Sequence, residues 1–397
     1  RAREWSMARL TSMGFANVRV EEFDMPVWVR GAESAEIVGE SPQKLAVAAL
    51  GRSGATPRGG VTAEVVGFAS VDELRAAPAQ SLRGKIAYVS HRMTRTQDGS
   101  SYGYWGAVRR TAPALAAEKG AVATVIRSLG TDLTRGPHTG VTTTPEGRRP
   151  SPAGALSNVD ADQLERLLAK GPVRMKLVLT PRFTGRQRSG NVIAEVPGTD
   201  PAAGVVLVGG HLDSWDLGTG AVDDAAGVAI TAAAAKRVMD AGRPRRTIRV
   251  VWFGAEEVGI EGSAAYLGRN GTTGLVFASE SDFGADRVWR ADFNFAPSNA
   301  PLADRVMAAL APLGIARGAD PATGGPDVGN LVRAGVSAID LQQDGTRYFD
   351  LHHTPDDTFD KVDPAQLRQN VAAWTAMLHV VANAPEEIPQ RPAAPAR

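Results

Sequence analysis

The sequence has no cysteine, almost no net charge and no long apolar run. Without cysteine, the chain forms neither a disulfide framework nor a thiolate zinc site, so any metal must be bound by His, Asp and Glu. Lys and Arg number 44 against 43 Asp and Glu, and a formal net charge of +1 supplies no field to hold nucleic acid or an anionic membrane. No apolar run approaches the length of a membrane span. We therefore expect neither nucleic acid binding nor a membrane span.

Length and composition are those of a globular protein with two domains. The 397 residues exceed the usual size of one core, and 43% hydrophobic residues suffice for two. The chain opens on Arg1 without an initiator Met. From this opening we expect a signal peptide to have been removed upstream, and hence a secreted or periplasmic protein.

The pattern of residues changes twice along the chain. Apolar spacing predicts a helix over residues 3–14, and alternation predicts an extended segment over residues 17–29. Residues 35–179 then carry short β runs punctuated by Gly, Pro and Ser, with two helices near residues 107–119 and 160–170. After Gly190, strands and helices alternate up to a long terminal helix over residues 364–383, which predicts a three-layer α/β sandwich with a mixed central sheet. The proline-rich tail, residues 386–397, is predicted to be disordered.

Histidines and acidic residues gather just after the predicted strands of the α/β region. Functional sites of such folds lie at the carboxyl ends of the strands. Two metals in a hydrolase need a shared carboxylate, terminal ligands and a nearby carboxylate that takes a proton from water. The sequence therefore predicts a two-metal hydrolase. The candidates, in chain order, are His211, Asp213, Asp223, Asp224, Glu256, Glu257, Asp282, His352 and His353.

Several of these residues have a simpler interpretation when taken alone. His211 could be a surface or hydrogen-bonded histidine, Asp282 a turn residue, and His352 or His353 an ordinary loop residue. With the other acidic residues in order around it, His211 is better explained as a ligand. Asp213, two residues later, is well placed to accept the other ring N–H of His211.

The two acidic pairs each divide into two roles. Asp223 and Asp224 open a predicted helix, where Asp is a common N-cap, so Asp224 could be only a cap while Asp223 is the better bridging ligand. Glu256 and Glu257 follow a hydrophobic strand, where two like charges are costly unless they bind cations or protons. One of them can be the general base and the other a ligand.

The motifs together resemble the zinc exopeptidase family of bacterial leucine aminopeptidases and prostate-specific membrane antigen, and most of all its carboxypeptidase Q branch. The matching stretches are GHLDSWD (210–216), GAVDD (220–224), AEE (255–257), ESD (280–282) and HHT (352–354), with PVWVRG (26–31), GVTAEV (60–65) and PHTG (137–140) in the first half. The resemblance implies a discontinuous catalytic domain of residues 1–34 and 186–385. It also implies that residues 35–185 are an inserted, β-rich protease-associated domain.

The family pattern assigns a role to each matching residue. It gives one zinc to His211 and Asp282, the other to Glu257 and His353, and makes Asp223 the bridge. It makes Glu256 the general base and suggests that His352 polarises the scissile carbonyl. It also makes Asp213 a residue that supports a metal ligand without contacting the metal itself.

The resemblance implies a dizinc exopeptidase that hydrolyses dipeptides or short peptides with free termini, and it suggests a homodimer. An aminopeptidase acting on longer peptides is the close alternative, because family members share the metal site and differ in the pocket. Two further alternatives are a receptor-like member without catalysis and a glutaminyl cyclase with one zinc. Arg347, Tyr348 and Phe349 are the candidate pocket residues near the last ligand.

Overall fold

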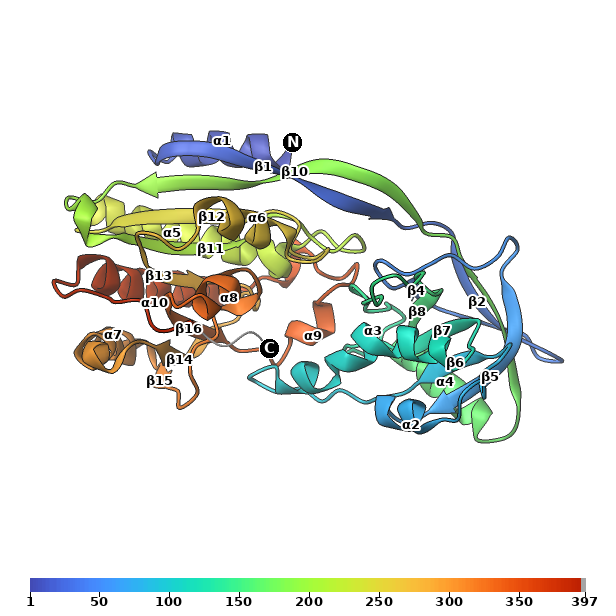
Figure 1. The fold of residues 1–397 in the computed structure, drawn as a ribbon. Coiled ribbons are helices and arrows are strands. Elements are labelled where there is room, and N and C mark those ends of the chain that lie inside the picture. Colours follow the sequence, from blue (N-terminus) through green and yellow to red (C-terminus); the bar gives the residue numbers. More distant parts are fainter. Residues whose placement is uncertain (394–397) are drawn as a thin grey trace.

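The computed structural model describes residues 1–393 and contains two eight-stranded β-sheets, which form two units side by side (Figure 1). The first sheet uses strands before residue 30 and after residue 181, and the second uses strands within residues 33–179. The second unit is therefore inserted in sequence between two strands of the first.

The first sheet is mixed, as the alternating pattern predicts. Its strands run, in spatial order, β1 (Ala16–Val29), β10 (Arg182–Val196), β12 (Thr247–Phe253), β11 (Val205–His211), β13 (Leu275–Glu280), β16 (Ser337–Gln343), β14 (Val288–Asn294) and β15 (Ala316–Arg317). The four central strands β12, β11, β13 and β16 are parallel to one another. Strands β11 and β12 are buried along almost their whole length, which explains their continuous apolar sequences.

Helices cover both faces of this sheet. One core joins α1 (Ala2–Ser12), α5 (Ala226–Ala241), α7 (Ala300–Leu310) and α10 (Pro364–Asn383) to one face, and a second core joins α6 (Glu261–Asn270) and α8 (Gly325–Arg333) to the other. The result is the predicted sandwich of three layers. A short helix, α9 (Tyr348–Leu351), lies between β16 and α10. Short helical turns cover Pro201–Ala203, Ala221–Ala225, Pro297–Asn299, Ala311–Leu313 and Phe359–Lys361. No helix of the described residues is long and apolar enough to cross a membrane.

The second sheet is also mixed and has its own cores. Its spatial order is β3 (Gln43–Leu45), β2 (Glu33–Val38), β9 (Val173–Leu179), β5 (Val61–Phe68), β6 (Ile86–Val89), β7 (Ala123–Arg127), β8 (Ala153–Leu156) and β4 (Val47–Ala49). Helix α4 (Asn158–Leu168) packs on one face, and α2 (Val71–Ala76) and α3 (Ser100–Glu118) pack on the other. The predicted helices near residues 107–119 and 160–170 correspond to α3 and α4.

A long two-stranded ribbon links the two units. Strands β1 and β10 pair antiparallel from Ala16 with Glu195 to Val29 with Arg182, and they carry the chain out to the second unit and back (Figure 1). Arg30, just beyond β1, donates to both carboxylate oxygens of Asp216 in the first unit and to Glu33 in the second. This arginine therefore ties the two units together at the end of the ribbon.

The predicted disordered tail is wrong in its first part. Ile388 is 3% exposed in the core of the first unit, and the backbone N–H of Arg391 donates to the carbonyl of Gly335. Arg246, only 1% exposed, donates to the carbonyls of Ala203, Val381, Ala384 and Glu386. A buried guanidinium and one apolar anchor therefore hold this proline-rich segment in place. Residues 394–397 lie outside the described residues.

We predict that Arg246→Met destabilises the first unit, because the carbonyls of its four partners lose a charged donor in a buried position. The free energy of unfolding should fall by about 2–4 kcal/mol, measured by urea denaturation. The matched control is Arg243→Met, which removes an exposed guanidinium bound to the carbonyls of Pro197 and Gly198 and should cost less than about 1 kcal/mol. Equal losses in the two variants would contradict the role given to Arg246.

Candidate metal centre

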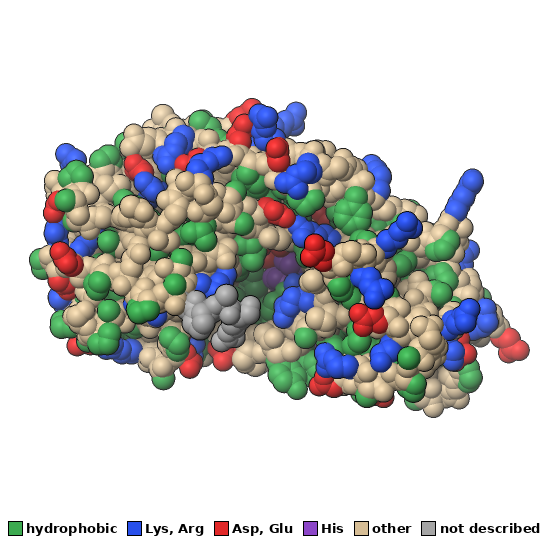
Figure 2. Space-filling model, viewed as in Figure 1, with side chains coloured by type: hydrophobic (Ala, Val, Ile, Leu, Met, Phe, Trp, Pro, Cys, Tyr) green, Lys and Arg blue, Asp and Glu red, His purple; other side chains and the backbone are tan. Residues whose placement is uncertain are grey.

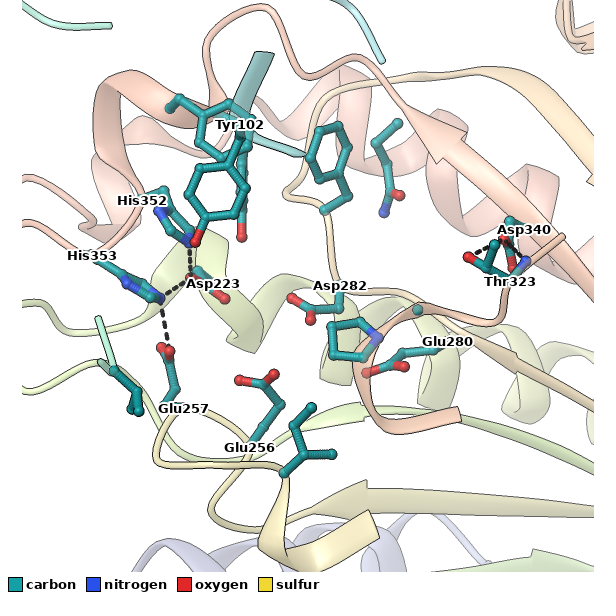
Figure 3. A pocket seen from close by; sticks show the side chains of 18 of the residues that line it. Tyr102, Asp223, Glu256, Glu257, Glu280, Asp282, Thr323, Asp340, His352 and His353 are labelled. Atoms are coloured by element: carbon teal, nitrogen blue, oxygen red, sulfur yellow. Dashed lines mark hydrogen bonds and ion pairs between the residues drawn. The ribbon is translucent and has the colours of Figure 1, made fainter. Parts of the chain in front are cut away.

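The predicted ligands come together at the carboxyl ends of the parallel strands. His211 is the last residue of β11, Glu256 and Glu257 follow β12, and Asp282 follows β13. Figure 3 shows the carboxylates of Asp223, Glu256, Glu257 and Asp282 around one space, with Asp223 and Glu257 beside the histidines that follow α9. The sequence places these residues far apart, and the parallel strands bring them to one edge of the sheet.

One half of the centre contains His211, Asp223 and Asp282. The Nε2 atom of His211 lies 3.0 Å from Oδ1 of Asp223 and 3.4 Å from Oδ1 of Asp282. Asp223 reaches the site from the turn before α5. All three are donors that zinc prefers in proteins.

The other half contains His353, Glu257 and the second oxygen of Asp223. The Nε2 atom of His353 lies 2.7 Å from Oε2 of Glu257 and 3.4 Å from Oδ2 of Asp223. The two oxygens of Asp223 thus face two different histidines. His352 is stacked on His353 at 3.6 Å between ring centroids, and its Nε2 lies 3.7 Å from Oδ2 of Asp223.

The contacts behind His211 differ from the prediction for Asp213. The Nδ1 atom of His211 lies 2.8 Å from the backbone carbonyl of Asp213 but 4.0 Å from its carboxylate. The carboxylate instead accepts the backbone N–H of Glu256 at 3.1 Å. The tight turn after β11 brings the carbonyl of Asp213 back to the ring of His211, and the carboxylate of Asp213 holds the loop that carries Glu256.

Asp224 caps α5 and also supports a ligand. Its Oδ1 accepts the backbone N–H of Gly227, and its Oδ2 accepts the backbone N–H of His211. A Cβ at Gly210 would lie 2.3 Å from Oδ2 of Asp224, so glycine is required there for this approach. The cap interpretation of Asp224 therefore holds, with the added role of fixing the end of β11.

Burial dominates the electrostatics of the acidic residues. It raises the pKa of Glu256 well above its ordinary value, and the carboxylates of Asp282 and Glu257 add to the rise. Burial and the neighbouring Asp223 do the same to the pKa of Glu257. For Asp223 itself burial acts in the same direction, but the hydrogen bond from His211 and the nearby histidines hold its pKa below the usual value. The site therefore concentrates negative charge in a place shielded from water.

The pKa values of His353 and His211 are shifted in opposite directions. Burial lowers the pKa of His353 to about 4, so its ring is neutral at physiological pH, which is the form that binds metals. Burial alone would also lower the pKa of His211, but Asp282 and Asp223 raise it well above the ordinary value. In the metal-free protein, a proton on Nε2 of His211 therefore stands where a cation would neutralise the two carboxylates.

The residues present fit a pair of divalent cations. Oε1 of Glu257 is buried with no hydrogen-bond partner among residues 1–393, and each oxygen of Asp223 faces its own histidine. Buried carboxylates without a counter-charge are costly, and cations bound between them would remove that cost. The assignment of His211 and Asp282 to one metal and of Glu257 and His353 to the other stays a prediction, because ligand atoms of His211, Asp223 and Glu257 also lie within 4.8 Å of one another.

A cavity of about 530 Å³ opens onto the centre between the two units. Figure 2 shows a hollow there, with histidine visible at its floor. The second unit contributes Tyr102, Arg109 and Arg110 of α3 to the wall. Tyr348 and Phe349 line the cavity as predicted, with Phe349 stacked on Tyr102 at 4.6 Å.

Arg347, the third predicted pocket residue, does not line this cavity. Its guanidinium forms an ion pair with Asp286, which holds it on the outer side of α9. The prediction was wrong because nearness in sequence to His353 does not show which way a side chain of the short helix points.

Sequence reasoning missed two residues that support the ligands. Asp357 accepts the backbone N–H groups of Val222 and Asp223 with its two oxygens, at 2.7 and 3.1 Å. The indole of Trp215 stacks on His353 at 5.1 Å. Both belong to the matching motifs or follow them directly, but a residue's type alone does not show that it lies behind a ligand.

Comparison with known proteins agrees with this geometry. Residues 191–378 match the model of peptidase family M28. The chain is 34% identical to carboxypeptidase Q of Mus musculus over 381 residues, which are 95% of this chain and 79% of the mouse protein. It is 33% identical to carboxypeptidase Q of Homo sapiens over the same shares of each chain. The protein belongs to peptidase family M28.

Solved structures of M28 peptidases share the whole architecture. A peptidase M28 precursor from Shewanella amazonensis is 44% identical, with a TM-score of 0.95 over 100% of this chain and 90% of that chain. A zinc aminopeptidase from Bacillus subtilis, 18% identical, has a TM-score of 0.67 over 98% of this chain and 91% of that chain, which shows a shared fold. This M28 member is thus a metallopeptidase, and it acts as an exopeptidase.

The geometry predicts different effects for the two adjacent glutamates. Glu256→Gln keeps the size of the side chain but removes the proton acceptor, so kcat should fall about 10²–10⁴-fold while metal content stays near that of the wild type. Glu257→Gln removes an oxygen 2.7 Å from His353 and should lower the metal content. Metal analysis of the purified variants beside their kcat separates the two. The opposite pattern would show that the roles of base and ligand are exchanged.

Proposed function

We propose that this protein is a two-zinc exopeptidase that hydrolyses dipeptides and short peptides with free termini. The observation that supports it most is the position of Asp223, whose two oxygens face His211 and His353 separately. A carboxylate shared between two sets of ligands is the arrangement that a pair of catalytic metals needs.

In this proposal Glu256 moves the proton. Zinc bound in the centre would polarise the scissile carbonyl and lower the pKa of a water molecule. Glu256 takes a proton from that water and later delivers it to the leaving amine. The bond from its backbone N–H to Asp213 keeps the base in place.

His352 is placed to donate a hydrogen bond to the substrate. Burial and the neighbouring His353 lower its pKa well below the ordinary value, so the ring is neutral. Its Nδ1 is buried with no partner among residues 1–393, whereas its Nε2 points toward Asp223 and the cavity. A neutral ring with N–H at Nε2 would orient and polarise the scissile carbonyl without opposing the metals.

The charges on the cavity wall favour a substrate with two free ends. Arg109 is 9% exposed, and its one hydrogen bond within residues 1–393 runs from Nη1 to the carbonyl of Thr139. Its Nε is buried without a partner. A buried guanidinium that lacks an acidic partner suits the carboxylate of a bound dipeptide. Glu280 also lines the cavity, and its Oε1, which has no hydrogen-bond partner among residues 1–393, suits the free amine.

Two alternatives from the sequence remain distinguishable. An aminopeptidase must leave the carboxyl side of its substrate open, and would make no use of Arg109. A receptor-like protein needs no ligands, whereas all five predicted ligands and the base meet here. A glutaminyl cyclase would need one zinc, and the two histidines facing Asp223 favour two.

Three wider proposals accompany the activity. Residues 35–185 would be a protease-associated domain, which agrees with a sheet confined to residues 33–179 and inserted between β1 and β10. A secreted or periplasmic location is the second proposal, and a homodimer, which the sequence resemblance alone suggests, is the third. Light scattering of the purified protein tests the homodimer.

The test of substrate class compares four peptides with the same first two residues. We expect kcat/KM to be highest for the free dipeptide, lower for its C-terminal amide and for a pentapeptide, and negligible for the N-acetyl dipeptide. Equal cleavage of the amide, the pentapeptide and the free dipeptide would replace the dipeptidase with the aminopeptidase alternative.

Arg109→Gln gives a second, independent measurement. The substitution keeps a donor for the carbonyl of Thr139 but removes the charge, so kcat/KM for the free dipeptide should fall about 10–100-fold, mainly through KM. The value for the amide should change little. Arg347→Gln is the control, because this arginine pairs with Asp286 outside the cavity and should leave both substrates unaffected.

A further inference from the structure

The segment that carries His352 and His353 is held mainly by the second unit. After β16, the backbone N–H of Gly345 donates to the carbonyl of Gln97. Thr131 then binds twice: its N–H donates to the carbonyl of Phe349 at 3.0 Å, and its hydroxyl donates to Asp350 at 2.7 Å. Gln97 and Thr131 both belong to the inserted residues. The chain leading to the last ligand is therefore anchored outside the sheet that supplies the other ligands.

The loop between β7 and β8 also binds both histidines. Nδ1 of His138 lies 2.7 Å from the carbonyl of His352, and Nδ1 of His353 lies 2.9 Å from the carbonyl of Thr139. Residues 130–140, called here the clamp loop, thus form hydrogen bonds with four of the five residues from 349 to 353. The PHTG motif, which the proposed chemistry does not use, provides two of these contacts.

The clamp loop is itself rigidly held. His138 is 1% exposed, and its Nε2 donates to Asp132 at 2.6 Å. A Cβ at Gly130 would lie 2.2 Å from that nitrogen, so the ring needs a glycine beside it. The hydroxyl of Thr139 accepts the indole N–H of Trp215 at 2.5 Å, which ties the loop to the strand end beyond His211.

His353 needs such support for two reasons. Its φ of +61° is unfavourable for a residue other than glycine, so the surrounding contacts must hold the backbone there. A hydrogen bond from Nδ1–H also fixes the ring in the tautomer whose Nε2 is free for a metal. The carbonyl of Thr139 provides that bond, and it simultaneously accepts Nη1 of Arg109.

We propose that the clamp loop of the second unit positions His353 and thereby sets the affinity of the metal shared by His353, Glu257 and Asp223. Thr131, His138 and Thr139 are positioning residues in this account, since none of them lines the cavity. The inserted unit is then a part of the metal centre as well as a wall of the cavity. The proposal rests on the two-zinc function, but its test uses no peptide.

The test uses two variants and a matched control. His138→Phe keeps a ring of similar size and removes both hydrogen bonds, and Thr131→Val removes only the bond to Asp350 while keeping the shape of the side chain. The control, Tyr88→Phe, removes the hydrogen bond from another buried side chain of the second unit to Glu165, away from residues 349–353. If His138→Phe fails to fold, Thr131→Val still provides the measurement.

The first measurement is the stepwise zinc affinity, by competition with a chromophoric chelator. We expect one of the two stepwise affinities to stay within about twofold of the wild type in both variants, and the other to fall about 10–100-fold in His138→Phe, as is typical for partners behind a metal ligand. Thr131→Val should show a smaller loss of the same kind. Tyr88→Phe should bind both metals as the wild type does.

The second measurement is hydrogen exchange of the metal-free protein. Peptides covering residues 349–353 should exchange at least about tenfold faster in His138→Phe, with α10 unchanged, because the clamp holds this segment without metal. Wild-type zinc affinity together with unchanged exchange at residues 349–353 would overturn the proposal. A wild type that binds a single zinc would contradict the two-zinc function, while hydrogen exchange would still decide on the clamp.

Discussion

The carboxylate of Asp223 is the constraint around which the rest of the site is arranged. It is 4% exposed, its two oxygens face His211 and His353 separately, and its backbone N–H is fixed by Asp357. The parallel strands bring Glu257 and Asp282 to either side of it (Figure 3). Such a concentration of buried negative charge is costly in the protein alone, and it becomes favourable only when cations share the same space. The site is therefore less favourable in free energy without bound cations than with them.

Much of the first unit's fold, and the place of the site in it, could be predicted from the sequence, because the patterns that indicate them lie within short stretches of the chain. Continuous apolar strands followed by Glu256, Glu257 or Asp282 indicate a parallel sheet with its site at the carboxyl ends. The alternation of strands and helices therefore predicted the mixed three-layer sandwich, whereas the division of the five ligands between two metals came from the family resemblance and stays a prediction. At Asp223, one oxygen faces His211 and the other faces His353.

The parts that sequence reasoning missed depend on tertiary contacts. The turn after β11 decides that the carbonyl of Asp213, not its carboxylate, binds His211. The hydrogen bond from Arg246 to the carbonyl of Glu386 and the burial of Ile388 hold the first part of the tail in place, although its composition indicates disorder. Nothing in the residue type of Thr139 shows that its backbone carbonyl would meet His353 from another unit. Backbone carbonyls are present at every position, so a sequence gives no sign of which ones matter.

The most direct test of the account is a crystal structure of the zinc-loaded protein with anomalous data collected at the zinc edge. Two zincs bridged by Asp223 should give two anomalous peaks about 3.5–4 Å apart, each within about 2.0–2.2 Å of a different oxygen of Asp223. The peak beside His211 should also contact Asp282, and the other should contact Glu257 and His353. A single peak, or two peaks of which only one contacts Asp223, would contradict the account.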